Sequence, residues 1–190
     1  MTTIDPRVVA RAGLLESYRS DGRTTWLEAT GRSMEPLIPA GSQLLVEFGA
    51  ISERVGDIIL FRRASGAVAH RVVGRRRIGD RQLLVAKGDG EALADPPFPP
   101  DDVLGVVREV RLPDGRSGGI AISRRRGAAL GRISWTSARV ARVGGRVASR
   151  LPSRLRPGAI AATHALAGFP TRVFMALIPR LDRGASAERR

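Results

Sequence analysis

The sequence Gly31-Arg32-Ser33-Met34-Glu35-Pro36 follows a β-prone run at 24–30 and decides how the rest of the chain is interpreted. Glycine allows positive φ, while proline fixes φ and biases the residue before it towards extended geometry. We therefore expect a sharp turn that holds the Ser33 hydroxyl out at the end of a strand. An ordinary Gly/Ser/Pro turn has the same composition, so the turn alone does not establish a function.

Three later residues supply the partners that a reactive serine needs. Ser33 is followed by His70 and then by Asp89 and Asp95. Serine, histidine and an acid are the parts of an activated nucleophile, provided that the fold brings them together. The imidazole has a suitable pKa to accept the serine proton, and a carboxylate would fix its tautomer. A structural histidine on a strand edge and a turn-forming aspartate at Asp89 remain the simpler alternatives.

The hydrophobic pattern predicts a mainly β fold. Helical spacing over 4–20 indicates one short amphipathic helix, which leaves no room for a helix-turn-helix before Thr24. Short β-prone runs broken by turn residues then predict strands at 26–30, 43–48, 57–62, 67–73, 82–86 and 103–110, with a further one at 119–122. Short strands without long intervening helices predict a coiled antiparallel sheet or a small barrel. The proline-rich stretch 96–100 should be a loop near the active face.

Charge divides the chain into a neutral part and a basic part. The 190 residues carry a net charge of +14, with 17 Lys+Arg against 16 Asp+Glu in 1–120 and 15 against 2 in 121–190. We expect an N-terminal helix and lead-in at 1–23, a β domain at 24–122 and an arginine-rich helical tail at 123–190. The sequence has no cysteine, and His70 and His164 lack metal-ligand spacing, so we expect neither a metal nor another cofactor.

The tail has three possible roles. Arginines between Arg124 and Arg156 alternate with apolar residues at helical intervals, as in a helix that lies on an anionic membrane. The same arginines would pair with nucleic-acid phosphates, but no base-reading motif accompanies them. A solvated extension is the third possibility. We interpret 158–178 as two short helices broken at Pro170. With neither a signal peptide nor a clear transmembrane helix, a cytoplasmic or membrane-surface location is expected.

Four short motifs occur in a fixed order. They are Ser33-Met34-Glu35-Pro36, Val55-Gly56-Asp57, His70-Arg71-Val72 and Lys87-Gly88-Asp89, with Asp95 after them. This succession resembles type I signal peptidases of the archaeal and endoplasmic-reticulum branch, within a superfamily shared with LexA-type repressors. The resemblance covers about 30–107. It implies a signal-peptidase fold and a serine endopeptidase that cleaves an extended peptide or precursor protein after a small residue.

Residue by residue, the resemblance assigns roles to the motif positions. Ser33 matches the nucleophile, His70 the general base and Asp95 the supporting acid, with Asp89 as the second candidate for the acid. Gly31, Met34 and Pro36 would shape the site or its oxyanion hole. The bacterial branch and the LexA-type proteins use lysine as the base, but the only lysine, Lys87, already occupies another motif.

Departures from the family pattern leave two alternative functions open. Signal peptidases commonly have a serine and a glycine where this chain has Gly31 and Arg32, so the oxyanion would depend on the backbone N–H of Ser33 and of Met34. The absence of an N-terminal anchor favours a dedicated substrate over general secretory traffic. The alternatives are a LexA-like self-processing regulator and a catalytically inactive peptide-binding module of the same fold.

Overall fold

The computed structural model describes 6–49, 54–63 and 66–117, and between 129 and 162 it describes shorter stretches. Those stretches are 129, 131–133, 136, 139–140, 143–144, 146–150, 152–155 and 157–162, and for 6–12 only the backbone is described. The elements in chain order are α1 (Pro6–Ser20), β1 (Thr24–Glu28), β2 (Gln43–Phe48), β3 (Ile58–Arg63), β4 (Gly66–Ile78), β5 (Arg81–Lys87), the 3-10 turn η1 (Pro100–Asp102) and β6 (Val103–Arg111). The strand predicted at 119–122 and the helix break predicted at Pro170 lie outside the described residues.

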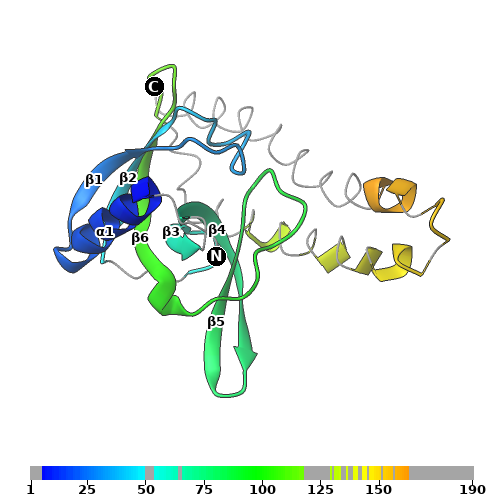
Figure 1. Cartoon of the computed structure of the whole chain (residues 1–190). Helices are drawn as coiled ribbons and strands as arrows, with labels where there is room; N and C mark the ends of the chain where they lie inside the picture. Colours follow the sequence, from blue (N-terminus) through cyan, green and yellow to red (C-terminus); the bar gives the residue numbers. More distant parts are fainter. Residues whose placement is uncertain are drawn as a thin grey trace, which may run out of the picture.

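The six strands form one antiparallel sheet, which confirms the mainly β prediction. Their order is β1-β2-β6-β3-β4-β5, so the last strand in sequence lies in the middle (Figure 1). β6 pairs with β2 on one side and with β3 on the other. The sheet has two ends, β1 and β5, and is therefore an open, coiled sheet and not a closed barrel.

β4 is longer than predicted because it pairs with two different strands in succession. Its first half, from Gly66 to Arg71, pairs with β3. Its second half, from Arg71 to Ile78, pairs with β5, with a register shift between Val72 and Gly74. Bulges bend and twist a strand, and here the bend carries β4 and β5 out of the main sheet. As a result, one edge of 66–70 has no strand paired to it within the described sheet.

Both faces of the sheet are covered by apolar packing. β2 buries alternate residues, as expected for a strand with one face in the core. β3 buries four residues in a row from Ile58 to Phe61, as expected for a central strand covered on both faces. Ile58 and Leu60 pack in the core that Leu15 of α1 covers. Ile59 and Phe61 pack in the second core, where Phe61 stacks on Phe98 with ring centroids 4.2 Å apart.

The described part of the tail is helical and joins the sheet domain at its start. An added Cβ at Gly131 would lie 3.0 Å from Val55 and 3.2 Å from the Val72 carbonyl oxygen, so Gly131 packs closely against the middle of β4. The described helical residues at 139–140, 143–144 and 146–148 lead away from the sheet, and 157–162 follows after the chain has turned back (Figure 1). Among the residues that the structure describes, no helix has the length and apolar character needed to cross a membrane.

Candidate active site

Ser33 lies in the turn segment between β1 and β2, which is fastened at both ends. The Ala29 N–H donates to the Ser42 carbonyl at 2.8 Å, and the Gly41 N–H donates to the Ala29 carbonyl at 2.7 Å. Within the segment, Met34 is buried in the core and its carbonyl accepts a hydrogen bond from the Ile38 N–H at 3.0 Å. The buried Met34 side chain and this backbone hydrogen bond therefore hold the turn against the core.

The outer residues of this turn are exposed. Gly31 does not have positive φ, and an added Cβ there would meet no atom within 4 Å, so the expectation that Gly31 supplies special backbone freedom was wrong. Arg32 donates from Nε to Glu35 at 2.9 Å. Pro36 follows a cis peptide bond and is not among the residues that line the cavity described below.

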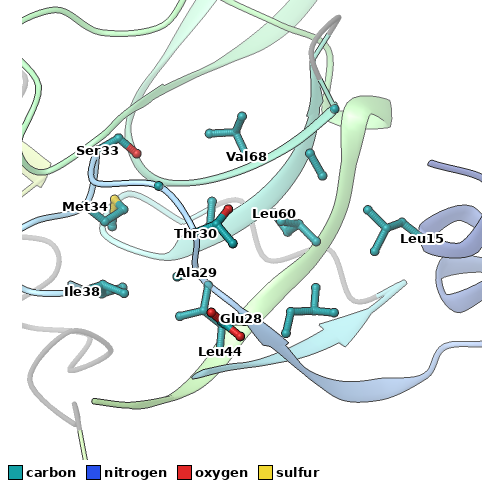
Figure 2. Close-up of a pocket in the computed structure, with 15 residues that line it drawn as sticks. Leu15, Glu28, Ala29, Thr30, Ser33, Met34, Ile38, Leu44, Leu60 and Val68 are labelled. Carbon is teal, nitrogen blue, oxygen red and sulfur yellow. The ribbon is translucent and has the colours of Figure 1, made fainter. Parts of the chain in front are cut away.

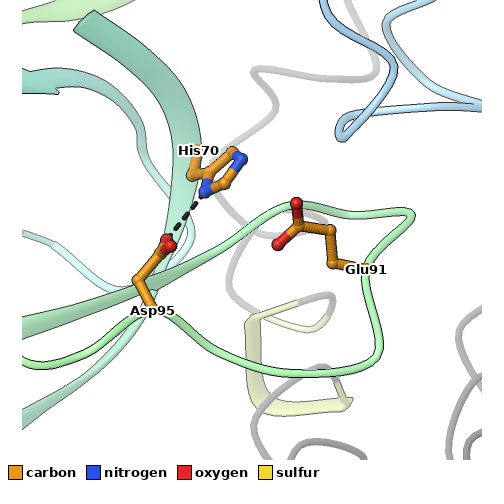
Figure 3. Close-up of side chains that lie close together, drawn as sticks. All are labelled: His70, Glu91 and Asp95. Carbon is orange, nitrogen blue, oxygen red and sulfur yellow. Dashed lines mark hydrogen bonds and ion pairs between the residues drawn. The ribbon is translucent and has the colours of Figure 1, made fainter. Parts of the chain in front are cut away.

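A continuous chain of hydrogen bonds joins Ser33, His70 and Asp95. His70 Nε2 is 2.9 Å from Ser33 Oγ, and His70 Nδ1 is 2.7 Å from Asp95 Oδ2 (Figure 3). With the proton on Nδ1, His70 donates to Asp95 and its Nε2 accepts from the serine hydroxyl. His70 and Asp95 are 2% and 4% exposed, so water has little access to the bond between them. This geometry is that of a nucleophile, a base and an orienting acid.

Asp95 is held by contacts that no sequence motif indicates. Its backbone N–H donates to the Ala86 carbonyl of β5 at 2.9 Å, which fixes the loop beside the strand. Arg63, at the end of β3, reaches its second oxygen, Oδ1, at 2.8 Å. Because Arg63 binds Oδ1 and His70 binds Oδ2, the carboxylate cannot rotate away from the imidazole. Arg63 lies in none of the sequence motifs, and only the three-dimensional pairing identifies it as a positioning residue.

Asp89, the second candidate acid, has its carboxylate on a different partner. Arg71 Nε and Nη2 donate to its two oxygens at 2.9 and 2.7 Å, a bidentate pair whose side chains are fully buried. Arg71 Nη1 also donates to the Gly56 carbonyl at 2.8 Å. Arg71 follows His70 in β4, so two consecutive residues send their side chains into different buried networks.

Gly88 and Gly90, on either side of Asp89, pack directly against the backbone of Ser33. A Cβ at Gly88 would lie 2.6 Å from the Ser33 carbonyl oxygen, and one at Gly90 would lie 2.8 Å from the Glu35 carbonyl oxygen. The Gly90 N–H also donates to the Ser33 carbonyl at 2.8 Å. Only glycine allows so close an approach of two backbones. These glycines shape the site, and the sequence had indicated only a turn here.

Lys87 precedes this loop and is 2% exposed. Its Nζ donates to the Gly88 carbonyl at 3.1 Å. Burial lowers the pKa of Lys87, an effect that the nearby charges of Asp89 and Glu91 oppose and that Arg71 reinforces. Lys87 therefore lies close to the serine loop, but the hydrogen bond to Ser33 Oγ comes from His70.

An apolar cavity of about 390 Å³ begins at Ser33 and runs to Leu15 of α1 (Figure 2). One wall is the start of β4, from Gly66 to Ala69, which pairs with β3 on one edge and with no described strand on the other. The second wall is the end of β1 with the residues up to Gly31. Its lining is completed by Met34, Ile38, Leu44 and Leu60. The volume is within the range of ligand pockets, which is about 300 to 1,000 Å³.

Glu91 is a third acid near the base. His70, Glu91 and Asp95 offer ligand atoms within 4.8 Å of one another, and Glu91 is exposed on the loop beside the imidazole (Figure 3). His70 and Asp95 already use Nδ1 and Oδ2 on each other. A cation bound by all three groups would therefore compete with the hydrogen bond between His70 and Asp95.

Two backbone donors lie next to the nucleophile. Among the described residues, the N–H groups of Ser33 and Met34 have no acceptor, whereas the next N–H, that of Glu35, donates to the Arg32 carbonyl at 3.1 Å. Free N–H groups beside an activated serine are the usual donors to the oxyanion of a tetrahedral intermediate. The structure therefore leaves available the two donors on which the sequence analysis relied.

Comparison with known proteins agrees with this geometry. Residues 4–86 match the family model described as Peptidase S24-like. Signal peptidase I W of Bacillus subtilis (strain 168) is 44% identical over 66 residues, which covers 33% of this chain and 35% of that protein. No solved structure matches the chain significantly. The chain is thus similar, over less than half of its length, to S24-like peptidases and to a signal peptidase. The family match includes Ser33 and His70 but ends before Asp89 and Asp95.

We expect Asp89→Asn and Asp95→Asn to have different consequences. Asp89→Asn leaves the buried Arg71 charge without its counterion and should lower the free energy of unfolding by about 3 to 5 kcal/mol. Asp95→Asn should cost less stability, because Arg63 reaches solvent, but should slow acylation of Ser33 by about 10⁴-fold, as loss of the orienting acid does in serine proteases. Urea unfolding and the rate of labelling by an acylating probe measure the two effects. If Asp89→Asn kept full stability and lost labelling, Asp89 would be the orienting acid.

Lys87→Met should make the chain more stable at neutral pH, with a benefit that declines at high pH. The folded-state pKa of Lys87 lies below that of the unfolded chain. Between those two values the unfolded chain binds the extra proton, so stability of the wild type rises with pH in that window, below about 10.5. Because Lys87 is the only lysine, no other lysine titrates in this pH window. Urea unfolding at a series of pH values tests this. A stability difference that stayed constant up to pH 10.5 would contradict it.

Proposed function

We propose that this chain is a serine endopeptidase of the signal-peptidase type with a Ser/His mechanism. The observation that carries the proposal is the hydrogen-bonded series from Ser33 Oγ through His70 to Asp95, at 2.9 and 2.7 Å. The similarities to a peptidase family and to a signal peptidase support the same class of reaction. The assignment to the archaeal and endoplasmic-reticulum branch is part of the proposal and rests on histidine as the base.

The proposed reaction follows from the positions of these groups. Ser33 Oγ attacks the carbonyl carbon of the scissile bond while His70 Nε2 takes its proton, and Asp95 stabilises the imidazolium. The backbone N–H groups of Ser33 and Met34 bind the oxyanion. His70 then returns the proton to the departing amine, which leaves an ester on Ser33. Water that gives up a proton to His70 attacks this ester and releases the acid and the free serine.

The cavity indicates how a peptide would lie in the site. The free edge of β4 between Gly66 and Ala69 offers main-chain groups to an extended segment, which would add to the sheet as a strand. Side chains of that segment would enter the apolar cavity, where Glu28 is the only charged residue among the described residues of the lining. This favours a substrate of uncharged residues, with cleavage after a small one as the family resemblance implies.

Self-processing is the second candidate function. It is supported by the family match, which is to S24-like peptidases and not specifically to signal peptidases. A LexA-like regulator would present a segment of its own chain to Ser33. Intact mass of the purified full chain over time distinguishes the two, with Ser33→Ala as the control that cannot cleave itself. Fragments that form in the wild type alone would establish self-processing.

The first prediction from this proposal concerns reactivity of the serine. A phosphonate or acylating probe should label the wild type, and the label should be absent from Ser33→Ala and strongly reduced in His70→Ala, because the hydroxyl needs its base. Lys87→Met should keep the label, since His70 contacts Ser33 Oγ. Intact mass gives the readout. A label lost in Lys87→Met and kept in His70→Ala would replace the Ser/His mechanism with a Ser/Lys one. No label and no peptide cleavage in any form would leave the inactive binding module.

A second prediction uses the open space at Gly31. A serine there has room, because nothing lies within 4 Å of an added Cβ. Its hydroxyl would add a donor to the two backbone N–H groups, and one such donor is worth about 10² to 10³ in rate where it is well placed. We expect Gly31→Ser to raise the labelling rate by at least about tenfold at unchanged stability. Gly31→Ala is the matched control, and an equal rise in both variants would exclude the hydroxyl as the cause.

A further inference from the structure

The described helical stretch of the tail exposes apolar side chains along one line. Val140, Val143 and Val147 are 54%, 59% and 57% exposed, at helical spacings of three and four residues. Ala148, on another side of the helix, is buried. Apolar residues aligned on one helical face usually pack against a neighbouring element. Here the aligned residues are the exposed ones.

Arginines follow the same stretch on a neighbouring line. Arg139, Arg146 and Arg150 are all exposed and are separated by seven and four residues. At 3.6 residues per turn Arg139 and Arg146 fall on one side of the helix, beside the three valines, and Arg150 follows in the turn at 149–150. The result is a face with an apolar line and a cationic line in parallel.

The apolar character continues at the turn that ends this stretch. Leu155 is 60% exposed and lies in the turn at 152–155, next to the exposed Arg154. Figure 1 shows this turn at the end of the tail that lies farthest from the sheet. Leucine and arginine side by side at a protruding turn repeat the combination seen along the helix.

We propose that Arg139, Val140, Val143, Arg146, Val147, Arg150 and Leu155 form a docking surface for an anionic lipid membrane. Valine and leucine side chains would enter the boundary between headgroups and acyl chains, while the arginines pair with lipid phosphates at the same depth. Charge complementarity and exposed apolar area act together in this arrangement. Either one alone would bind a membrane weakly.

Nucleic acid fits this face less well. Phosphate contacts need the arginines but gain nothing from three exposed valines and a leucine. Single-stranded nucleic acid is held by aromatic stacking, and 139–162 contains no aromatic residue. A solvated extension would not need its valines aligned. The surface therefore selects an anionic membrane over the other two possibilities.

The attachment of the tail gives such docking a consequence for the candidate active site. Gly131 contacts the Val72 carbonyl, two residues after His70 on β4. Docking of the tail would thus bring a membrane to the surface of the molecule that this contact joins to β4. The proposal itself does not depend on catalysis, because it concerns only binding of lipid.

The test is sedimentation of the full-length chain with vesicles of phosphatidylglycerol and phosphatidylcholine, against vesicles of phosphatidylcholine alone. We expect binding to the anionic vesicles that weakens as salt is raised. Arg139→Gln, Arg146→Gln and Arg150→Gln combined should reduce the partition coefficient roughly a hundredfold. Val140→Ser, Val143→Ser and Val147→Ser combined should reduce it at least about tenfold. All these side chains are exposed, so thermal unfolding should be unchanged.

The matched control removes the same charge elsewhere. Exposed arginines also lie near the end of β4, at Arg75, Arg76 and Arg77. Their combined change to Gln should leave the partition coefficient within about twofold of that of the wild type. Loss of binding in this control and not in the tail variant would overturn the proposal. So would binding of duplex DNA without binding of vesicles. Labelling of Ser33 should be equal in every tail variant, so the test of lipid binding is independent of the test of peptidase activity.

Discussion

The buried ion pair between Arg71 and Asp89 is the interaction on which the candidate site depends most. Breaking a buried pair costs about 3 to 5 kcal/mol, because the remaining charge has no counterion. The pair fixes the loop that contains Gly88 and Gly90, and that loop packs on the backbone of Ser33. The serine backbone is thus positioned through the guanidinium of Arg71, and the next residue along β4, His70, contacts the serine hydroxyl. A family resemblance that identifies Asp89 with the chemistry overlooks this structural role.

β4 changes its pairing partner from β3 to β5 at His70 and Arg71, and this change positions both the base and the support of the serine loop. His70 belongs to the half paired with β3, and Arg71 is where pairing with β5 begins. One residue supplies the base and the next supplies the support of the serine loop. The same change of partner leaves the edge of 66–70 free, which is the wall of the apolar cavity. The positions of His70 and Arg71 and the free edge at 66–70 among the described strands all follow from the same bend in β4.

The apolar periodicity of the sequence predicted most of the strands. The contacts that side chains and glycines make with distant parts of the chain could not be predicted, because they depend on packing. Strands at 43–48 and 103–110 carry clear apolar patterns, and the structure places them within one residue of the expected limits. The bulge in β4 has no signature in sequence, so its length and double pairing were missed. Arg63 could not be found, since an arginine at a strand end is ordinary until Asp95 lies 2.8 Å away. Gly31 was expected to supply backbone freedom, whereas the site requires glycine at Gly88 and Gly90 for close packing, because a sequence shows where glycines occur and not which backbones they approach.

The central position of β6 bears on when the site can form during synthesis. Ser33 lies on the segment that joins β1 to β2, whereas His70 and Asp95 belong to the part built from β3, β4 and β5. Only β6, the last strand to leave the ribosome, pairs with both parts. In a nascent chain that ends before Val103, Ser33 lies with β1 and β2 and His70 lies with β3, β4 and β5. The strand that pairs with both groups has not yet been made. From this topology we expect Ser33, His70 and Asp95 to come together only after β6 has been made.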